Sequence, residues 1–235
     1  MIYTIKKPAG NKVSAWELKE EGRAVRYFGN LTEDRLDFLE ASADLVGTLR
    51  IRTEDTDKTA EAYIRKLDLE TLIASAEGEV GGEKRSSMAF AAKDKDVFYY
   101  ELRQETNSMN LRVEYKPRSK RTYLNYNIGG MYFEMPLRGR DDYILGKCEL
   151  CGDGFPKADE GGITIRNASR FALRIYLKHV PISGKDSRQA ELLEHQMQMN
   201  RHLAKLDSIS REGLIKAQEA SARTAEDDSK PAAEA

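Results

Sequence analysis

The most regular pattern along this chain is the alternation of apolar and polar residues that is typical of half-buried β-strands. Residues 170–180 show it most clearly, because alternate positions are apolar and the positions between them are mostly basic or aromatic. A pairing error of one residue would bury the basic side chains, so the register of this strand is firmly set. One face is predicted to carry Phe171, Leu173, Ile175 and Leu177, and the other Arg170, Arg174, Tyr176 and Lys178.

Further strand signals recur along the chain, separated by segments rich in turn-forming residues. Gly129-Gly130 is a strong hairpin signal. Short turns rather than crossover helices join the strands after residue 90, which favours antiparallel pairing. The predicted strands cover residues 13–18, 23–28, 49–52, 97–103, 111–115, 121–128, 131–135, 143–145, 163–166 and 170–180.

Helical spacing of apolar residues appears in three segments, residues 33–46, 57–76 and 186–222. The second is predicted to form one helix or two helices divided at Asp68. The third contains no proline and has only a thin apolar stripe. A helix this polar gains little stability alone, so it should lie along the rest of the protein or pair with a copy of itself. Residues 78–87 and 152–162 are predicted to be loops.

Together these elements predict an α+β fold. Its centre is a mostly antiparallel sheet or a partly open barrel, covered by the helices of residues 33–76. Residues 1–183 would form this β-rich body, residues 184–222 a helical extension, and residues 223–235 a disordered acidic tail.

Composition gives few clues to function. The 235 residues have a formal net charge of −1, so no overall charge attracts a polyanion. No apolar run approaches the roughly 18–20 residues of a membrane-spanning helix, and the N-terminus lacks a signal peptide. We therefore expect a cytoplasmic protein without a membrane partner. No phosphate-binding loop, serine nucleophile elbow or zinc-protease motif is present, which disfavours an enzyme. An enzyme with an unrecognised site stays open as a hypothesis beside the two developed below.

The most specific motif is Cys148-x-x-Cys151 with Gly152 directly after it. This arrangement is half of a zinc-ribbon knuckle, and zinc needs four ligands. The interpretation favoured by the sequence is a turn with two reduced thiols and no cofactor. The alternatives are a zinc site completed by histidine, carboxylate or a second subunit, and a redox dithiol.

A basic and aromatic segment is the main candidate binding site. Cations that meet phosphates and tyrosines that stack on bases are the combination that holds single-stranded nucleic acid. We therefore expect a nucleic-acid-binding accessory protein, with a basic hairpin tip and packed tyrosines as the alternative. The predicted site consists of Lys116, Arg118, Lys120, Arg121, Tyr115, Tyr123 and Tyr126, joined by Arg170 and Arg174.

The C-terminal helix supports a different hypothesis, a structural or assembly protein. Leu192, Met199, Leu206 and Gly213 are each seven residues apart, as in a weak coiled-coil seam. Such a helix would form a homo-oligomer or dock into a larger protein complex. Packing of the same residues on the protein's own body is the alternative.

Overall fold

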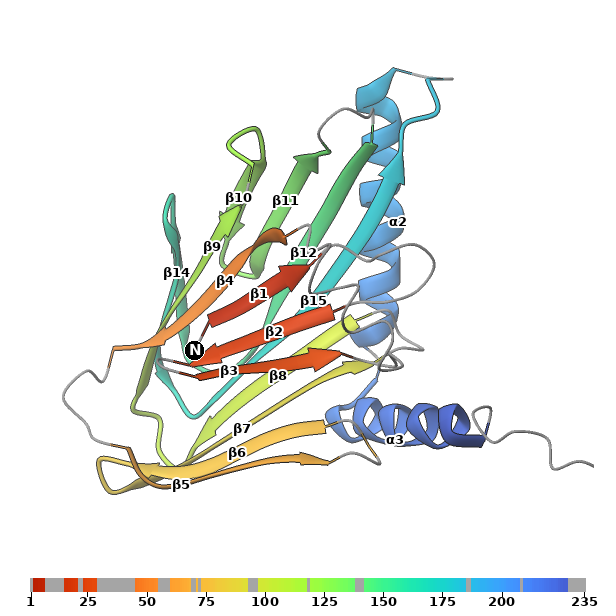
Figure 1. The fold of residues 1–235 in the computed structure, drawn as a ribbon. Coiled ribbons are helices and arrows are strands. Elements are labelled where there is room, and N and C mark those ends of the chain that lie inside the picture. The colour runs from red at the N-terminus through yellow and green to blue at the C-terminus, as the bar shows by residue number, and fades with distance from the viewer. Residues whose placement is uncertain are drawn as a thin grey trace, which may run out of the picture.

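The architecture is two antiparallel β-sheets packed face to face, with two helices on the outer face of one of them (Figure 1). No helix in the described part of the chain precedes residue 188, so the predicted α+β fold with helices covering a sheet or partly open barrel is wrong. The computed structural model describes residues 2–6, 15–20, 23–28, 45–54, 60–68, 71, 73–92, 97–117, 119–137, 142–184, 187–207 and 209–227.

Sheet A contains seven strands: β1 (Ile2–Lys6), β2 (Ala15–Glu20), β3 (Arg23–Phe28), β4 (Leu45–Thr53), β9 (Met109–Pro117), β13 (Phe155–Asp159) and β14 (Gly162–Ala168). Their order across the sheet is β13-β14-β9-β4-β1-β2-β3. Strands β2 and β3 form a hairpin and agree with the strands predicted at residues 13–18 and 23–28.

Sheet B contains eight strands: β5 (Ala60–Asp68), β6 (Ile73–Val80), β7 (Glu83–Ala92), β8 (Val97–Gln104), β10 (Tyr123–Asn127), β11 (Gly130–Pro136), β12 (Asp142–Gly152) and β15 (Arg170–Pro181). Their order is β10-β11-β12-β15-β8-β7-β6-β5. The predicted hairpin at Gly129-Gly130 is confirmed by the β10–β11 pair.

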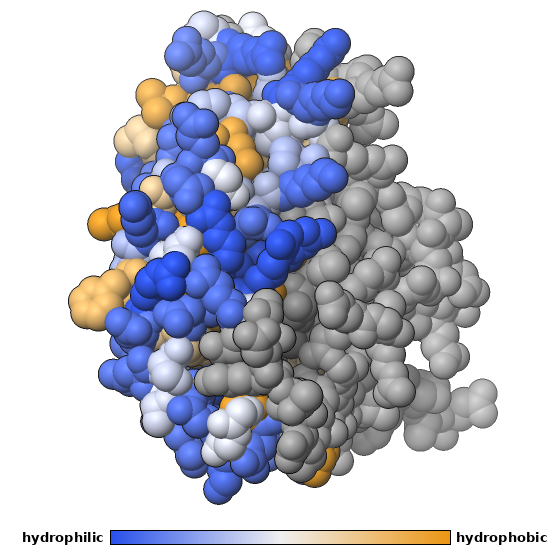
Figure 2. Space-filling view, turned by 90° about the vertical axis from the view of Figure 1, so that its left-hand side faces the viewer, coloured by the Kyte–Doolittle hydropathy of each residue, from blue (hydrophilic) through white to orange (hydrophobic). Residues whose placement is uncertain are grey.

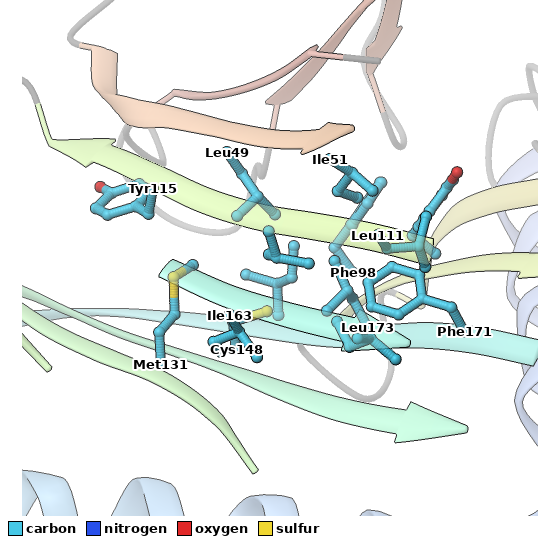
Figure 3. Packing of buried hydrophobic residues seen from close by; sticks show 14 of the residues in the cluster. Leu49, Ile51, Phe98, Leu111, Tyr115, Met131, Cys148, Ile163, Phe171 and Leu173 are labelled. Carbon is cyan, nitrogen blue, oxygen red and sulfur yellow. The ribbon is translucent and has the colours of Figure 1, made fainter. Parts of the chain in front are cut away.

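The core between the sheets is built by alternating residues of both inner faces. In β9, Met109, Leu111, Val113 and Tyr115 are buried while the residues between them are partly exposed. They face side chains of sheet B such as Phe98, Met131, Phe171 and Leu173 (Figure 3). This alternation is the pattern expected of sheets that pack about 10 Å apart.

Two aromatic rings bridge the sheets at the centre of this core. Tyr115 of sheet A and Phe133 of sheet B stack with ring centroids 4.5 Å apart. A Cβ at Gly47 would overlap the Tyr115 ring, and a Cβ at Gly146 would overlap the Phe133 ring. Both glycines are therefore needed for close approach of the rings to the sheets.

A second apolar cluster covers the outer face of sheet B. It joins Phe90, Tyr99, Leu145 and other residues of the sheet to the helices α2 (Arg188–Asp207) and α3 (Arg211–Asp227). Sheet B is thus apolar on both faces, which explains why β8 is almost continuously buried. Neither helix, nor any other helical segment among the described residues, is long and apolar enough to cross a membrane.

The helix predicted at residues 57–76 is wrong, because residues 60–68 form β5 and residues 73–76 begin β6 of sheet B. Their Glu, Lys, Ala and Leu content favours a helix locally, but pairing of β6 with both β5 and β7 overrides that preference. Of the helix predicted at residues 33–46, residues 33–44 lie outside the described part, and the last two begin β4.

Three further predicted segments differ in detail. Residues 78–87 are a tight hairpin between β6 and β7, with Gly81 and Gly82 at φ of 61° and 82°, rather than a flexible loop. Residues 152–162 contain β13. The predicted helix at residues 186–222 is two helices, because Ser210 starts a new one: its Oγ accepts the N–H of Gly213 at 3.1 Å.

Candidate functional site

The most unusual group on the outer face of sheet B is the carboxylate of Glu101. It lies in the middle of β8, between inward-facing Tyr100 and Leu102, and is only 2% exposed. A carboxylate this buried requires partners that neutralise it. Those partners come from three separate parts of the chain.

Three arginines and one tyrosine surround Glu101. Arg103 Nε, Arg170 Nε and Arg211 Nε lie 2.7, 2.9 and 2.8 Å from its two oxygens. The Tyr99 hydroxyl donates a further hydrogen bond at 2.8 Å. Because Arg211 is the first residue of α3, this cluster ties the helix to β8 and β15. We call these five residues the Glu101 cluster.

The electrostatics of the cluster favour the ionised carboxylate. Burial alone would raise the pKa of Glu101, but hydrogen bonds from Arg103, Arg170 and Tyr99, with the charge of Arg211, lower the pKa to about 2. Burial also raises the pKa of Tyr99 to about 12, so this hydroxyl stays protonated and donates. The cluster therefore acts as a fixed ionic clamp at neutral pH.

Other contacts hold both helices along their length. Leu192, Met199 and Leu206 of α2 are nearly or fully buried against sheet B. Gln218 of α3 donates from Nε2 to the carbonyl of Thr71 at 2.9 Å. The three apolar members of the seven-residue repeat therefore pack on the protein's own sheet.

The predicted binding residues are distributed over several surfaces. Lys116, Lys120 and Arg121 are exposed around the β9–β10 connection, and Arg118 lies outside the described residues. Arg170 belongs to the Glu101 cluster. Arg174 is 8% exposed and lies 3.1 Å from Glu149 on the outer face of sheet B.

The tyrosines are also divided. Tyr115 is buried between the sheets, and the Tyr126 hydroxyl bonds its backbone, accepting from Tyr115 N–H at 2.8 Å and donating to its carbonyl at 3.1 Å. Tyr123 faces outward and is 55% exposed. The register across β10, β11, β12 and β15 places Tyr123 level with Lys178. Arg170 lies further along β15, at a distance of about 26 Å from Lys178 along that strand.

The two cysteines lie on opposite faces of one strand rather than in a turn. Both belong to β12, where Cys148 packs in the core between the sheets and Cys151 against the helical side. They therefore cannot share one metal ion in this fold. Nowhere in the described ranges do three His, Cys, Asp or Glu side chains form a group that could hold a metal.

The outer face of sheet A around β4, β9 and β14 differs sharply from that of sheet B. It carries ion pairs between strands: Arg52 of β4 lies 3.2 Å from Glu114 of the neighbouring β9, and Arg112 of β9 lies 2.6 Å from Asp159 at the end of β13. Figure 2 views the side of the molecule where β14 lies and shows mostly hydrophilic side chains with scattered hydrophobic ones. This face is charge-balanced and suited to water.

Comparison with known proteins adds a likeness of fold. No family model matches the chain, and no curated protein matches it in sequence. A solved structure described as "Putative kojibiose phosphorylase from human microbiome" matches with a TM-score of 0.52 and 10% identity. The likeness establishes the fold alone. The match covers 94% of this chain but only 30% of that one, so this chain spans less than a third of its length.

The Glu101 cluster was missed in the sequence. The signal in the sequence is a single acidic residue within the otherwise apolar run Val97–Leu102, because such a residue needs a cationic partner when both faces of its strand are buried. The sequence does not show which cations pair with Glu101, because Arg211 lies 110 residues further along the chain.

Proposed function

We propose that this chain is an assembly module of a carbohydrate-active protein. In this role the sandwich holds α2 and α3 in a fixed position, and the outward side of α2 docks against another folded domain. That domain would be carried on the same polypeptide or on a separate one. The carbohydrate class comes from the name of the similar structure, in which the shared fold makes up 30% of the chain.

The observation that carries the proposal is a row of exposed apolar residues on α2. Leu193 and Met197 are 56% and 48% exposed, although both belong to a helix whose opposite side is buried. Ala190 and Ala204 are exposed as well, and the spacing of three, four and seven residues places all four on one side of the helix. We call Ala190, Leu193, Met197 and Ala204 the α2 outer row.

The rigidity of the helices supports the same proposal. The Glu101 cluster fixes the start of α3, and Glu191 accepts the N–H of Ser183 at 2.7 Å near the start of α2. A surface that is held in place loses less conformational entropy when it binds. The α2 outer row is therefore suited to a stable contact between domains.

Photo-cross-linking tests this proposal in the cells that make the protein. A photoreactive amino acid replaces Met197, and Glu79, exposed on the β6–β7 hairpin, provides the control position. We expect position 197 alone to form adducts with a folded carbohydrate-active domain, identified by mass spectrometry. Equal adducts from both positions, adducts only with a second copy of this chain, or none would contradict the proposal.

We propose as a second candidate that the β9–β10 connection binds single-stranded nucleic acid. Lys116, Lys120 and Arg121 are exposed there, and Tyr123 is exposed directly after them. Cations beside an accessible aromatic ring are the elements of such a site. This candidate uses four of the residues proposed from the sequence.

Fluorescence anisotropy with a labelled single-stranded oligonucleotide tests the second candidate. Changing Lys116, Lys120 and Arg121 to Ala should weaken binding about tenfold or more and reduce its dependence on salt. A control variant changes Lys84, Lys157 and Arg201, which are exposed elsewhere, and removes the same charge. Equal affinities for the two variants would contradict specific binding at this connection.

A further inference from the structure

The outer face of sheet B extends beyond the area covered by α2. This helix lies along β15 and bonds to it and to β12: Lys178 Nζ donates to Gln198 at 2.7 Å, and Lys147 Nζ donates to Asn200 at 3.0 Å. Strands β10 and β11 lie on the far side of β12 from β15 (Figure 1). Their outward side chains lie at the edge of the sheet, beside the outer apolar cluster, where those of β10 are exposed and those of β11 are half-buried.

The register places polar and aromatic side chains together on that surface. Tyr123 of β10 is opposite Glu134 of β11, and Asn125 is opposite Tyr132. Tyr132 is in turn opposite Lys147 of β12. The inward positions of β11 are the core residues Met131, Phe133 and Met135, so the residues between them point away from the core. We call Tyr123, Asn125, Tyr132, Glu134 and Lys147 the tyrosine patch.

The patch combines a flat apolar ring with fixed polar groups. Tyr123 and Asn125 are exposed, whereas Tyr132 and Glu134 are half-buried. The Tyr132 hydroxyl donates to Glu134 Oε1 at 2.7 Å, which holds the carboxylate in place. Burial chiefly raises the pKa of Tyr132, and the neighbouring Glu134 and Tyr123 raise it further, so its hydroxyl remains protonated. In the register Tyr123 is diagonal to Tyr132, two positions along the paired strand.

The charges of the patch are balanced. Glu134 supplies one negative charge and Lys147 one positive charge, and Lys147 is also 3.0 Å from Glu149. Within the patch a phosphate chain would meet the Glu134 carboxylate as well as the single ammonium group of Lys147, since Lys120 and Arg121 belong to the β9–β10 connection. A neutral ligand with many hydroxyl groups would find both donors and acceptors without a net electrostatic penalty.

We propose that the tyrosine patch binds a neutral sugar. The C–H face of a pyranose ring packs on the exposed Tyr123 ring, and its hydroxyl groups bond to Asn125, Glu134 and Lys147. This inference takes the class of ligand from the proposed function, but it does not depend on the docking surface. The α2 outer row and the tyrosine patch share no residue, so each can fail without the other.

Saturation-transfer NMR with kojibiose as the probe tests the inference. The full chain should transfer saturation to the sugar, and Tyr123→Ala should weaken the affinity about tenfold, because the stacking surface is lost. Tyr123→Leu keeps an apolar side chain at the site but lacks the flat ring, and should weaken it to a similar extent. Phe155→Ala is the matched control, since Phe155 is 72% exposed at the edge of sheet A.

The outcomes separate the alternatives. Binding that is lost in both Tyr123 variants and kept in Phe155→Ala supports the sugar site. Absence of transfer in the parent chain, or equal loss in all three variants, overturns it. Binding of a single-stranded oligonucleotide that requires Tyr123, without binding of kojibiose, overturns it in favour of a phosphate-chain ligand. Cross-linking at residue 197 reads out the docking proposal independently of each result.

Discussion

Replacing Glu101 with Gln tests the ionic clamp on which the position of α3 depends. The substitution keeps the size of the side chain but removes its charge, so Arg103, Arg170 and Arg211 are left to repel one another in a partly buried site. Because Glu101 is only 2% exposed, water cannot replace the lost carboxylate. Removal of one member of a buried ionic group typically costs about 3–5 kcal/mol.

The pKa of Glu101 gives a second route to the magnitude. A pKa of about 2 in the folded protein, against an ordinary value of 4.5, corresponds to about 3 kcal/mol of folding free energy at neutral pH. The folded-state pKa is the lower one, so this contribution is complete above about pH 4.5 and is lost as the pH falls towards 2. We therefore expect Glu101→Gln to lower the free energy of unfolding by about 3 kcal/mol at pH 7.

Urea denaturation followed by circular dichroism measures this difference between pH 7 and pH 3. The gap between parent and variant should narrow below about pH 4.5. There Glu101 takes up a proton when the parent unfolds, while the folded carboxylate stays ionised, and this proton uptake lowers the free energy of unfolding of the parent. Glu212→Gln is the control, since that exposed carboxylate is adjacent to Arg211 and should change stability by less than about 0.5 kcal/mol. A Glu101→Gln effect below about 1 kcal/mol, or one that does not change with pH, would refute the clamp.

Two further predictions concern the core. Cys148 should be alkylated only after unfolding, because it is buried and burial raises the pKa of its thiol. The half-buried Cys151 should react first. Peptide mass spectrometry measures the order of labelling, and faster labelling of Cys148 would contradict the prediction. Gly146→Ala should destabilise the protein by about 1–3 kcal/mol, because the new Cβ overlaps the Phe133 ring. Gly129→Ala, at a site with more space, is the control for urea denaturation, and equal losses in the two variants would contradict the packing argument.

Strands with clean alternation could be predicted from the sequence, and the reason is visible in the structure. Residues 170–180 were assigned to the right element, with Phe171, Leu173 and Ile175 on the core side. The residues on the opposite side of that strand were predicted, but the burial of two of them was not. Arg174 and Tyr176 alternate as if they faced water, yet α2 covers them and both are 8% exposed.

Local sequence patterns could not predict the two-sheet architecture. Residues 57–76 have a composition that suits a helix, but residues 60–68 and 73–76 are strands because β6 pairs with both β5 and β7. The Cys148-x-x-Cys151 spacing suggested a turn, but pairing with both β11 and β15 draws the segment into a strand. In both cases contacts between segments distant in sequence decided the outcome.

The candidate site was predictable only in part. Tyr115 and Tyr123 looked equivalent in sequence, because both flank the same basic turn. The chain crosses from sheet A to sheet B between them, so Tyr115 points into the core and Tyr123 away from it. A pattern along one strand cannot reveal such a crossing.

The cross-linking comparison between residues 197 and 79 tests the central claim most directly. If the sandwich holds α2 so that its outer row docks a carbohydrate-active domain, only the probe at residue 197 will capture that domain. Capture of the same proteins by both probes, or of no such domain by the probe at residue 197, would show that the exposed row is not a docking surface.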